Sequence, residues 1–167
     1  IFVRSLYTDR ENRLWIGTEA GLYLYDREKD NFINYDGPVV MWMLEDSNGV
    51  FWMATKEGLF QFDPHNGALS FIMKGISWKI FLYQDSSGNI WVGSSGDGAD
   101  VLDPESGNWR HYEYDAENPS SISGNFIETI HQDRKGTIWI GTNNGFNKFL
   151  PDSHTFIHYH IPDGLPH

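Results

Sequence analysis

Few residues of this chain have the types and spacing that catalysis or metal binding needs. Cysteine is absent, so thiolate chemistry, disulfides and cysteine-ligated metal sites are excluded. His154, His158 and His160 cluster without a carboxylate at ligand spacing, and the three aspartates between residues 97 and 103 lack the full calcium-loop pattern. The sequence shows no Ser/His/Asp arrangement and no nucleophile elbow. We therefore expect no catalytic residue, no metal site and no cofactor.

Ligand binding is the chemistry that the aromatic residues favour. Carbohydrate sites use exposed rings to cover the apolar face of a sugar, together with carboxylates and amides for its hydroxyls. Trp109 stands where two other repeats carry Phe32 and Phe156, which favours packing, and Trp42 lies within an expected strand and is interpreted as core. Trp78 follows a Lys-Gly-Ile-Ser segment at an expected junction of loop and strand. It is therefore the strongest candidate for a sugar platform.

Four polar residues complete the candidate ligand-binding set. Arg4 and Glu128 both lie five residues before a repeated aspartate, on the strand expected to line the axis of the fold; a solvated or ion-paired channel lining is the alternative. Asn125 ends the long linker 114–125, and Asp97 lies in a loop that varies between repeats. Long loops on rigid scaffolds often carry function. A structural clasp is an equally good interpretation of the linker.

The secondary-structure elements that must position these residues are encoded by one sequence motif, which the chain repeats four times. Each copy carries a tryptophan six residues after an aspartate, and the tryptophans recur every 37 to 48 residues. A period of about 40 residues indicates a repeat architecture. Recurring residues are interpreted as structural, and functional residues are expected where the copies differ. The recurring residues are Asp9 and Trp15, Asp46 and Trp52, Asp85 and Trp91, and Asp133 and Trp139.

Each copy divides into four short apolar runs separated by turn residues, which predicts four strands. A glycine stands three residues before the tryptophan in three copies, and Asn12 replaces it in the first; both residue types tolerate the positive φ of tight turns. No stretch has sustained helical periodicity. Four antiparallel strands in about 40 residues are typical of a β-propeller blade. The predicted fold is therefore all-β, with four four-stranded antiparallel blades.

One blade cannot bury both faces of its twisted sheet, so the repeated tryptophan is expected to form the wedge between neighbouring blades. Residues 1–167 are predicted to be a partial β-propeller and a fragment of a larger one, because an open arc leaves apolar faces in water. We expect self-association, as a homodimer or by ring completion in a crystal. Residues 161–167 resemble the lead-in to a further blade. The expected blades are residues 1–37, 38–74, 75–114 and 123–160.

The overall composition limits the classes of molecule that the chain is expected to bind. The net charge of −11 disfavours nucleic acid and acidic lipid. No apolar run approaches the roughly 18–20 residues of a membrane helix. Residues 1–9 already resemble a strand, so no signal peptide is expected there. We expect a soluble segment that contacts neither nucleic acid nor membrane.

The repeats resemble those of a known family. The segments DRENRLWIGTEAGLYLYD, DSNGVFWMATKEGLFQFDP, DSSGNIWVGSSGDGADVLDP and DRKGTIWIGTNNGFNKFLP are similar to the two-component regulator propeller repeat. The linker 114–133 and the ending 158–167 are similar to that family as well. Ala54, Ala99 and Leu150 depart from the motif, which indicates variation between blades.

The resemblance implies the periplasmic sensor region of a hybrid two-component system from Bacteroides-type bacteria. Such regions commonly detect oligosaccharides, carry more repeats, and precede an immunoglobulin-like module, a membrane helix and a kinase. The implied function is a non-catalytic segment that senses an oligosaccharide, with any histidine kinase activity in other parts of the parent protein. Two alternatives stay open: a structural or protein-interaction propeller, and a propeller lyase or glycan-cleaving enzyme.

Overall fold

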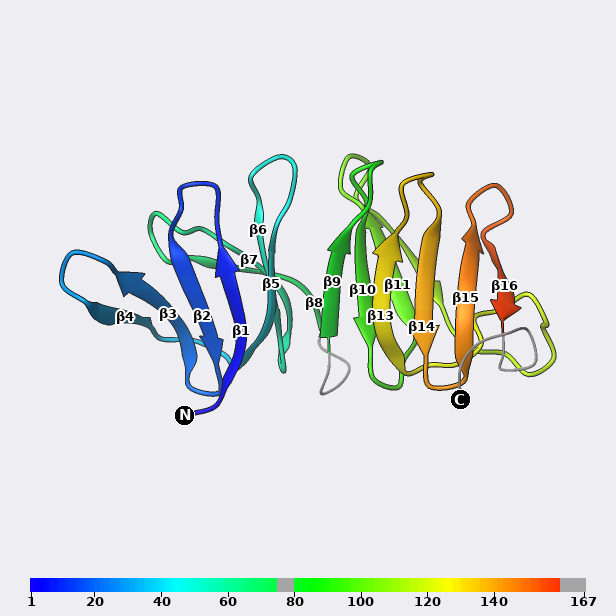
Figure 1. The fold of residues 1–167 in the computed structure, drawn as a ribbon, viewed down its shortest axis with the longest axis horizontal. Coiled ribbons are helices and arrows are strands. Elements are labelled where there is room, and N and C mark those ends of the chain that lie inside the picture. Colours follow the sequence, from blue (N-terminus) through cyan, green and yellow to red (C-terminus); the bar gives the residue numbers. More distant parts are fainter. Residues whose placement is uncertain (75–79, 160–167) are drawn as a thin grey trace. The chain divides into compact units, whose positions relative to one another are not determined.

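The chain forms two compact units, Ile1–Ile76 and Ser77–His167, and each is described by itself. The computed structural model describes residues 1–74 and 80–159 (Figure 1). Every element of regular structure in these two ranges is a strand. The described residues accordingly contain no helix long and apolar enough to cross a membrane. The predicted all-β class, with four four-stranded antiparallel sheets, is confirmed.

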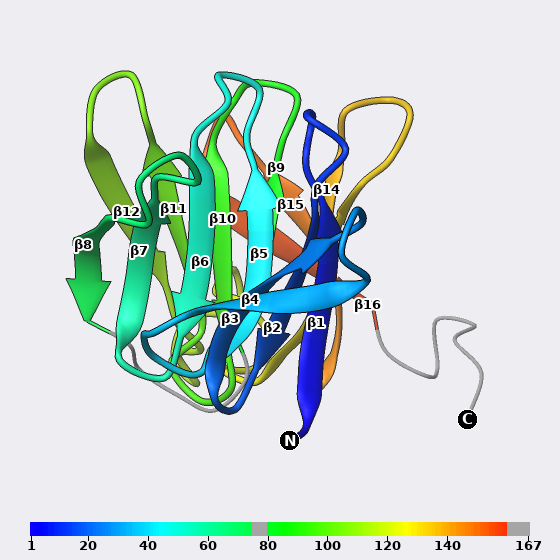
Figure 2. The same ribbon diagram turned by 90° about the vertical axis from the view of Figure 1, so that its left-hand side faces the viewer.

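Two meandering sheets make up the first unit, and sequential strands are hydrogen-bonded neighbours in each. Figure 2 shows β4 crossing β1 steeply, because the sheet is strongly twisted. The first sheet contains β1 (Val3–Thr8), β2 (Leu14–Thr18), β3 (Gly21–Asp26) and β4 (Asn31–Tyr35). The second sheet contains β5 (Val40–Glu45), β6 (Phe51–Thr55), β7 (Gly58–Phe62) and β8 (Leu69–Lys74).

The second unit repeats this plan. Its two sheets have the same strand order, and the linker predicted at 114–125 lies between them. The third sheet contains β9 (Ile80–Gln84), β10 (Ile90–Ser94), β11 (Ala99–Asp103) and β12 (Asn108–Tyr112). The fourth sheet contains β13 (Ile127–Gln132), β14 (Ile138–Thr142), β15 (Gly145–Leu150) and β16 (Thr155–Tyr159).

The first turn of every sheet needs a residue in the left-handed region. Gly49, Gly88 and Gly136 adopt φ values of 82°, 88° and 83°. Asn12 takes this position in the first sheet with a φ of 60°. Asparagine is among the few residues with a side chain that enter this region readily, which is why it can stand in for glycine here.

A single carboxylate fastens this turn to the repeated tryptophan. In the second, third and fourth sheets, Oδ1 of the repeated aspartate accepts two backbone N–H groups of the turn, at 2.8–3.0 Å. In all four sheets, Oδ2 accepts the indole N–H six residues on, at 2.8–2.9 Å. In the first sheet, Arg13 supplies one backbone N–H and a guanidinium contact of 2.6 Å to the same carboxylate. Each sheet therefore carries its own local tie.

The indole ring of the earlier sheet in each unit packs against the later sheet. In the first unit, Trp15 is fully buried and lies 5.7 Å from Phe51 and 5.2 Å from Phe62 of the second sheet, centroid to centroid. In the second unit, Trp91 lies 5.0 Å from Phe149 of the fourth sheet. The indole of the fourth sheet, Trp139, is partly buried and stacks on a phenylalanine of its own sheet. Rings that meet edge to face add specificity to the apolar burial.

A polar latch joins the two sheets of each unit beside this aromatic core. In each unit, a backbone N–H of the earlier sheet donates a hydrogen bond to a side chain of the later sheet. The donor residue comes directly after the repeated aspartate of its sheet, and the acceptor residue comes directly before the repeated aspartate of its own. Glu45 Oε2 accepts from Arg10 N and Gln132 Oε1 accepts from Ser86 N, each at 2.8 Å. The backbone N–H of Gln132 donates to the hydroxyl of Tyr83 at 3.2 Å, and the first unit has the matching bond at 3.0 Å. The two units therefore use one docking scheme.

Candidate functional site

The candidate residues from the sequence fall in different places. Trp78 lies outside the described residues. Arg4 lies on β1 of the first unit, where it pairs with Glu19 of the β2–β3 turn and its guanidinium lies 5.8 Å from the ring centroid of Phe2. Glu128 lies on β13 of the second unit with an exposed side chain. The structure thus shows Arg4 in an ion pair within its own sheet.

Asn125 and Asp97 are brought together in the second unit. The carbonyl of Asn125 accepts the backbone N–H groups of Gly96 and Gly98, at 2.9 Å each, and so holds the loop that carries Asp97. The side-chain oxygen of Asn125 accepts the backbone N–H of Tyr114 at 2.6 Å. Asn125 therefore pins both ends of the linker, and most of its polar capacity is used in doing so.

The linker is attached to the fourth sheet by buried polar contacts. Ile122 is fully buried, and the main chain of Ser120 accepts the N–H of Phe156 at 2.9 Å. Asn147, also fully buried, accepts the N–H of Ser123 and donates to its hydroxyl, at 2.9 Å each. Buried polar groups need such partners because water cannot replace them. The linker acts here as a clasp on β15 and β16.

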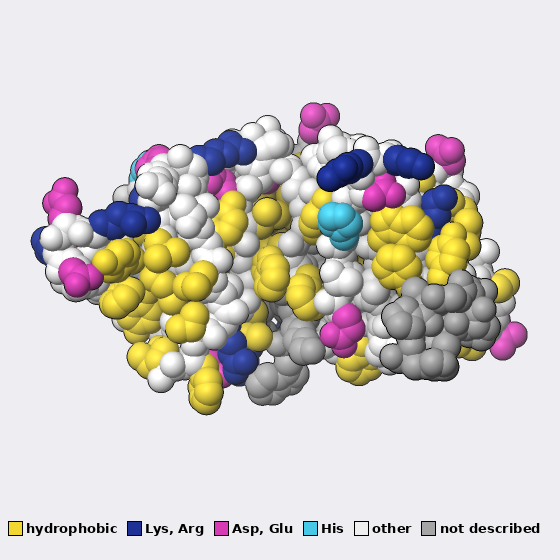
Figure 3. All heavy atoms as spheres, viewed as in Figure 1, with side chains coloured by type: hydrophobic (Ala, Val, Ile, Leu, Met, Phe, Trp, Pro, Cys, Tyr) yellow, Lys and Arg dark blue, Asp and Glu magenta, His cyan; other side chains and the backbone are white. Residues whose placement is uncertain are grey.

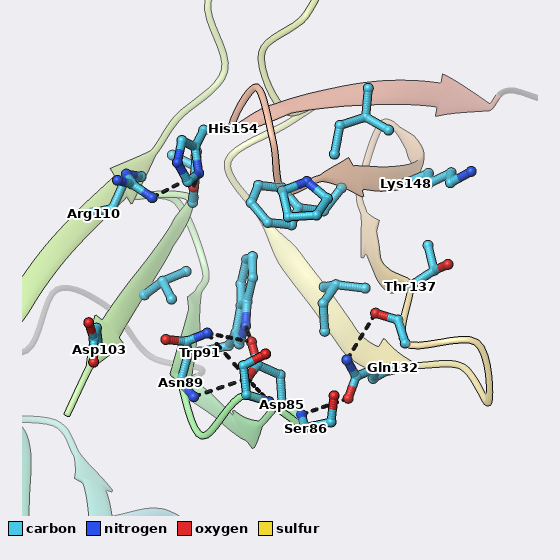
Figure 4. A pocket seen from close by; sticks show the side chains of 18 of the residues that line it. Asp85, Ser86, Asn89, Trp91, Asp103, Arg110, Gln132, Thr137, Lys148 and His154 are labelled. Atoms are coloured by element: carbon cyan, nitrogen blue, oxygen red, sulfur yellow. Dashed lines mark hydrogen bonds between the residues drawn. The ribbon is translucent and has the colours of Figure 1, made fainter. Parts of the chain in front are cut away.

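A groove of about 620 Å³ lies between the third and fourth sheets in the second unit. Figure 4 shows it from close by, with side chains converging from both sheets. The third sheet contributes the β9–β10 turn and the faces of β11 and β12, and the fourth contributes the β13–β14 and β15–β16 turns. Side chains from two rigid sheets therefore meet around one space.

The inner wall of the groove is aromatic. Trp91, Tyr112 and Phe149 line it and belong to the buried core of the unit. Trp91 and Tyr112 are stacked with centroids 6.1 Å apart, and Phe149 meets Tyr112 edge to face at 5.4 Å. Burial raises the pKa of Tyr112, so its hydroxyl is neutral at physiological pH and is able to donate a hydrogen bond. The wall is thus rigid and apolar with a polar hydroxyl at its edge.

Arg110 and His154 form one end of the groove. Arg110 extends from β12 and its Nη1 donates to Nδ1 of His154 at 2.8 Å. A guanidinium has no acceptor, so His154 Nδ1 must be the acceptor and the ring proton resides on Nε2. Figure 4 shows these two side chains pointing toward each other from β12 and from the turn before β16. Both side chains are exposed to solvent.

The two carboxylates of the groove are engaged by their own turns. Asp85 accepts the indole N–H of Trp91 and the side-chain amide of Asn89, at 2.9 and 3.0 Å. Asp103 accepts the hydroxyl of Ser106 at 2.6 Å, and this bond, with two backbone N–H groups, lowers the pKa of Asp103. Asp103 therefore lacks the raised pKa of a general acid. Among the described residues, no three His, Cys, Asp or Glu side chains gather as metal ligands.

Arg110 was not among the candidates from the sequence, and His154 was considered only as a member of a histidine cluster, although the repeats contain a signal for both. In the register of the last strand, Arg110 pairs with Val101, and the matching positions of the first and fourth sheets hold Ile33 and Ile157. His154 has a φ of 56°, and the matching turns place an aspartate or a glycine in the same left-handed conformation. Differences at such positions, compared repeat by repeat, would have marked both residues.

Comparison with known proteins shows which family the repeats resemble. Residues 1–20, 77–96 and 121–144 match a family described as two component regulator propeller. These segments are two-component regulator propeller repeats. The matches fall on the first, third and fourth of the four sequence repeats. A search of curated proteins finds no match to the chain.

Solved structures share the fold of these propeller repeats. The extracellular domain of a putative hybrid two-component system from B. thetaiotaomicron matches 95% of the chain with a TM-score of 0.77 and 24% identity. A second such domain from that organism matches 87% with a TM-score of 0.75 and 24% identity. Virginiamycin B lyase from Staphylococcus aureus matches 94% with a TM-score of 0.70 and 14% identity. The chain spans 21%, 20% and 55% of these proteins. The four sheets are propeller blades, and their number fits a fragment of a larger propeller.

Proposed function

We propose that the chain is a non-catalytic, ligand-sensing segment of a periplasmic sensor in a hybrid two-component system, and that the ligand is an oligosaccharide. One observation carries the proposal: two-component regulator propeller repeats occur here in a fold shared with extracellular domains of putative hybrid two-component systems. Any kinase of such a system would belong to another part of the protein. Ligand binding would act by favouring one arrangement of the sensor over another.

The size and lining of the groove between the third and fourth sheets suit a small polar ligand. Its volume of about 620 Å³ lies within the range typical of ligand pockets, roughly 300–1,000 Å³. An aromatic wall adjoins hydrogen-bonding groups such as Arg110, His154 and Thr137. Sugars present apolar ring faces beside hydroxyl groups, and this combination suits them.

The same geometry gives no support to a catalytic role. Acid–base catalysis requires a group whose pKa lies near the operating pH. The carboxylates that line the groove are held by hydrogen bonds, and His154 is engaged by Arg110. The likeness to a lyase rests on 14% identity and concerns the fold.

Calorimetric titration of the complete extracellular region containing this chain tests the proposal. The titrants are neutral, uronate-bearing and sulfated oligosaccharides, and we expect saturable heat with at least one of them. The oligosaccharide should be recovered intact, as judged by mass spectrometry. Absence of heat with every saccharide would favour a protein-interaction propeller, and cleavage of the bound saccharide would establish an enzyme.

A further inference from the structure

We propose that Arg110 and His154 bind an anionic substituent, so that the ligand of the groove is an acidic saccharide carrying a carboxylate or sulfate group. The inference rests on the proposed function and names the ligand class for the same site. It follows from three observations: the partners of Arg110, the backbone at His154, and the distribution of charge in the groove.

Arg110 is a cation without an acidic partner in the described structure. Its Nη1 donates to His154 Nδ1 at 2.8 Å, and its guanidinium also interacts with the hydroxyl of Tyr112. No carboxylate of the described residues lies within ion-pair distance of its guanidinium. The chain has 23 acidic and 12 basic residues, so acidic partners are abundant elsewhere. The remaining N–H groups of Arg110 are therefore free for a planar anion, which a guanidinium binds with two parallel hydrogen bonds.

His154 supplies a second donor beside this guanidinium. Because Nδ1 accepts from Arg110, Nε2 carries the ring proton and can donate to a ligand. The residue has a φ of 56°, a conformation that the matching turns give to Asp30, Gly67 and Gly107. Left-handed backbone is uncommon for residues other than glycine, and histidine is among the few that adopt it more often. The imidazole is therefore held at this end of the groove by a turn that ordinarily uses a smaller residue.

Neither carboxylate of the groove forms an ion pair with Arg110. Asp103 lies on the same side of Figure 4 as Arg110 and is occupied by the hydroxyl of Ser106. Figure 4 shows Asp85 at the opposite end, beside Ser86 and Gln132. Its oxygens are occupied by the indole of Trp91 and by the β9–β10 turn. Lys148 extends away from Arg110 in the same view and does not contribute to the pair. The groove thus offers donors at Arg110 and His154, while its two carboxylates are occupied by donors of their own turns, which favours an acidic ligand.

The test uses the complete extracellular region and pairs of oligosaccharides of equal length, one neutral and one bearing glucuronate. Arg110→Ala removes the cation, Arg110→Lys keeps the charge without the planar fork, and His154→Asn keeps a residue that tolerates the turn. Arg27→Ala is the control, because it removes an exposed arginine of the first unit that lies over Tyr25. Thermal melting of each variant checks that the fold is intact.

We expect the glucuronate-bearing saccharide to bind and Arg110→Ala to weaken it roughly 10- to 100-fold, the usual loss for a charge-assisted hydrogen bond. Arg110→Lys and His154→Asn should weaken it less, Arg27→Ala should leave it unchanged, and added salt should reduce its affinity. A folded Arg110→Ala variant that binds the acidic saccharide like the parent overturns the inference. So does equal binding of the neutral and acidic forms, and in both cases the sensing function stands. If no saccharide binds, the sensing function and the inference fail together.

Discussion

The repeated aspartate is the residue on which each blade depends. Its spacing from tryptophan was evident in the sequence, but the reason for the spacing was not. The carboxylate at the end of the first strand reaches the turn with one oxygen and the indole N–H with the other. Such a contact joins residues six apart across a hairpin, and only the register of the two strands shows that they meet. The tryptophans could be interpreted as packing residues from their size, whereas the aspartates required the structure.

Asp46→Asn should destabilise the fold by about 1–3 kcal/mol, the cost of leaving a buried donor unsatisfied. Asp46 is 1% exposed and accepts the indole N–H of Trp52 at 2.8 Å. The new amide would place an N–H against this donor, or give up one of the turn contacts. Urea denaturation measures the change. The matched control is Asp152→Asn, because Asp152 is exposed and has no hydrogen bond among the described residues. Equal stability of the two variants would show that the tie contributes little.

The residues at the end of the groove mark the limit of sequence-based inference. Arg110 and His154 lie 44 positions apart and meet only because β12 and the turn before β16 face each other. The candidates chosen from the sequence were selected for their type and their loop, and Arg4 and Asn125 proved to be engaged in ion pairing and linker attachment. Comparison of repeats identifies unusual positions, but their convergence depends on the packing of two sheets.

At the scale of elements, the strands and turns were largely predictable. Alternating apolar runs and turn residues indicated four strands in each repeat, and the structure has four in each sheet. The latch between sheets was not predictable, because one of its partners is a backbone N–H, which any residue offers. The packing of the linker was left open as well. Its attachment depends on Asn147, which has no distinguishing feature in the sequence but is fully buried against Ser123.

Tyr83→Phe should lower the stability of the second unit by about 1 kcal/mol, a typical net value for one hydrogen bond. The hydroxyl of Tyr83 accepts the N–H of Gln132, at the junction of the third and fourth sheets. Removal of the hydroxyl leaves this N–H without its acceptor and changes little else in shape. Hydrogen exchange at Gln132 and denaturation report the effect. Tyr114→Phe is the control, since its hydroxyl has no bond in the described part of the chain. Unchanged exchange at Gln132 would argue against the latch.

At the scale of the whole molecule, the first sheet has an uncovered apolar face. Leu6 is 66% exposed and Phe32 is 61% exposed. The register places Met43 and Ile130 at positions that match Leu6, and Phe156 at a position that matches Phe32. These three are 4%, 8% and 4% exposed because a neighbouring sheet covers them. Figure 3 shows hydrophobic side chains gathered over β1–β4.

We expect this face to bind a second copy of the chain, so that the isolated chain self-associates with increasing concentration. Replacement of Leu6 and Phe32 by lysine should shift the population toward monomer, because the charged groups would have to be desolvated on association. Sedimentation velocity over a concentration series measures the shift. The control is Ile157→Lys, which introduces a charge at a position 42% exposed in the second unit. A parent chain that stays monomeric at every concentration would contradict the expectation.

The local nature of the aspartate tie bears on how such chains can lengthen during evolution. Every tie closes within six residues, so a duplicated stretch of DNA that encodes one repeat also encodes its own fastening. The latch uses a peptide N–H and a tyrosine hydroxyl of the preceding copy, and Tyr7 and Tyr83 supply that hydroxyl in the first and third repeats. A newly inserted copy can therefore dock wherever the copy before it carries this tyrosine, and its loops are then free to diverge toward new ligands.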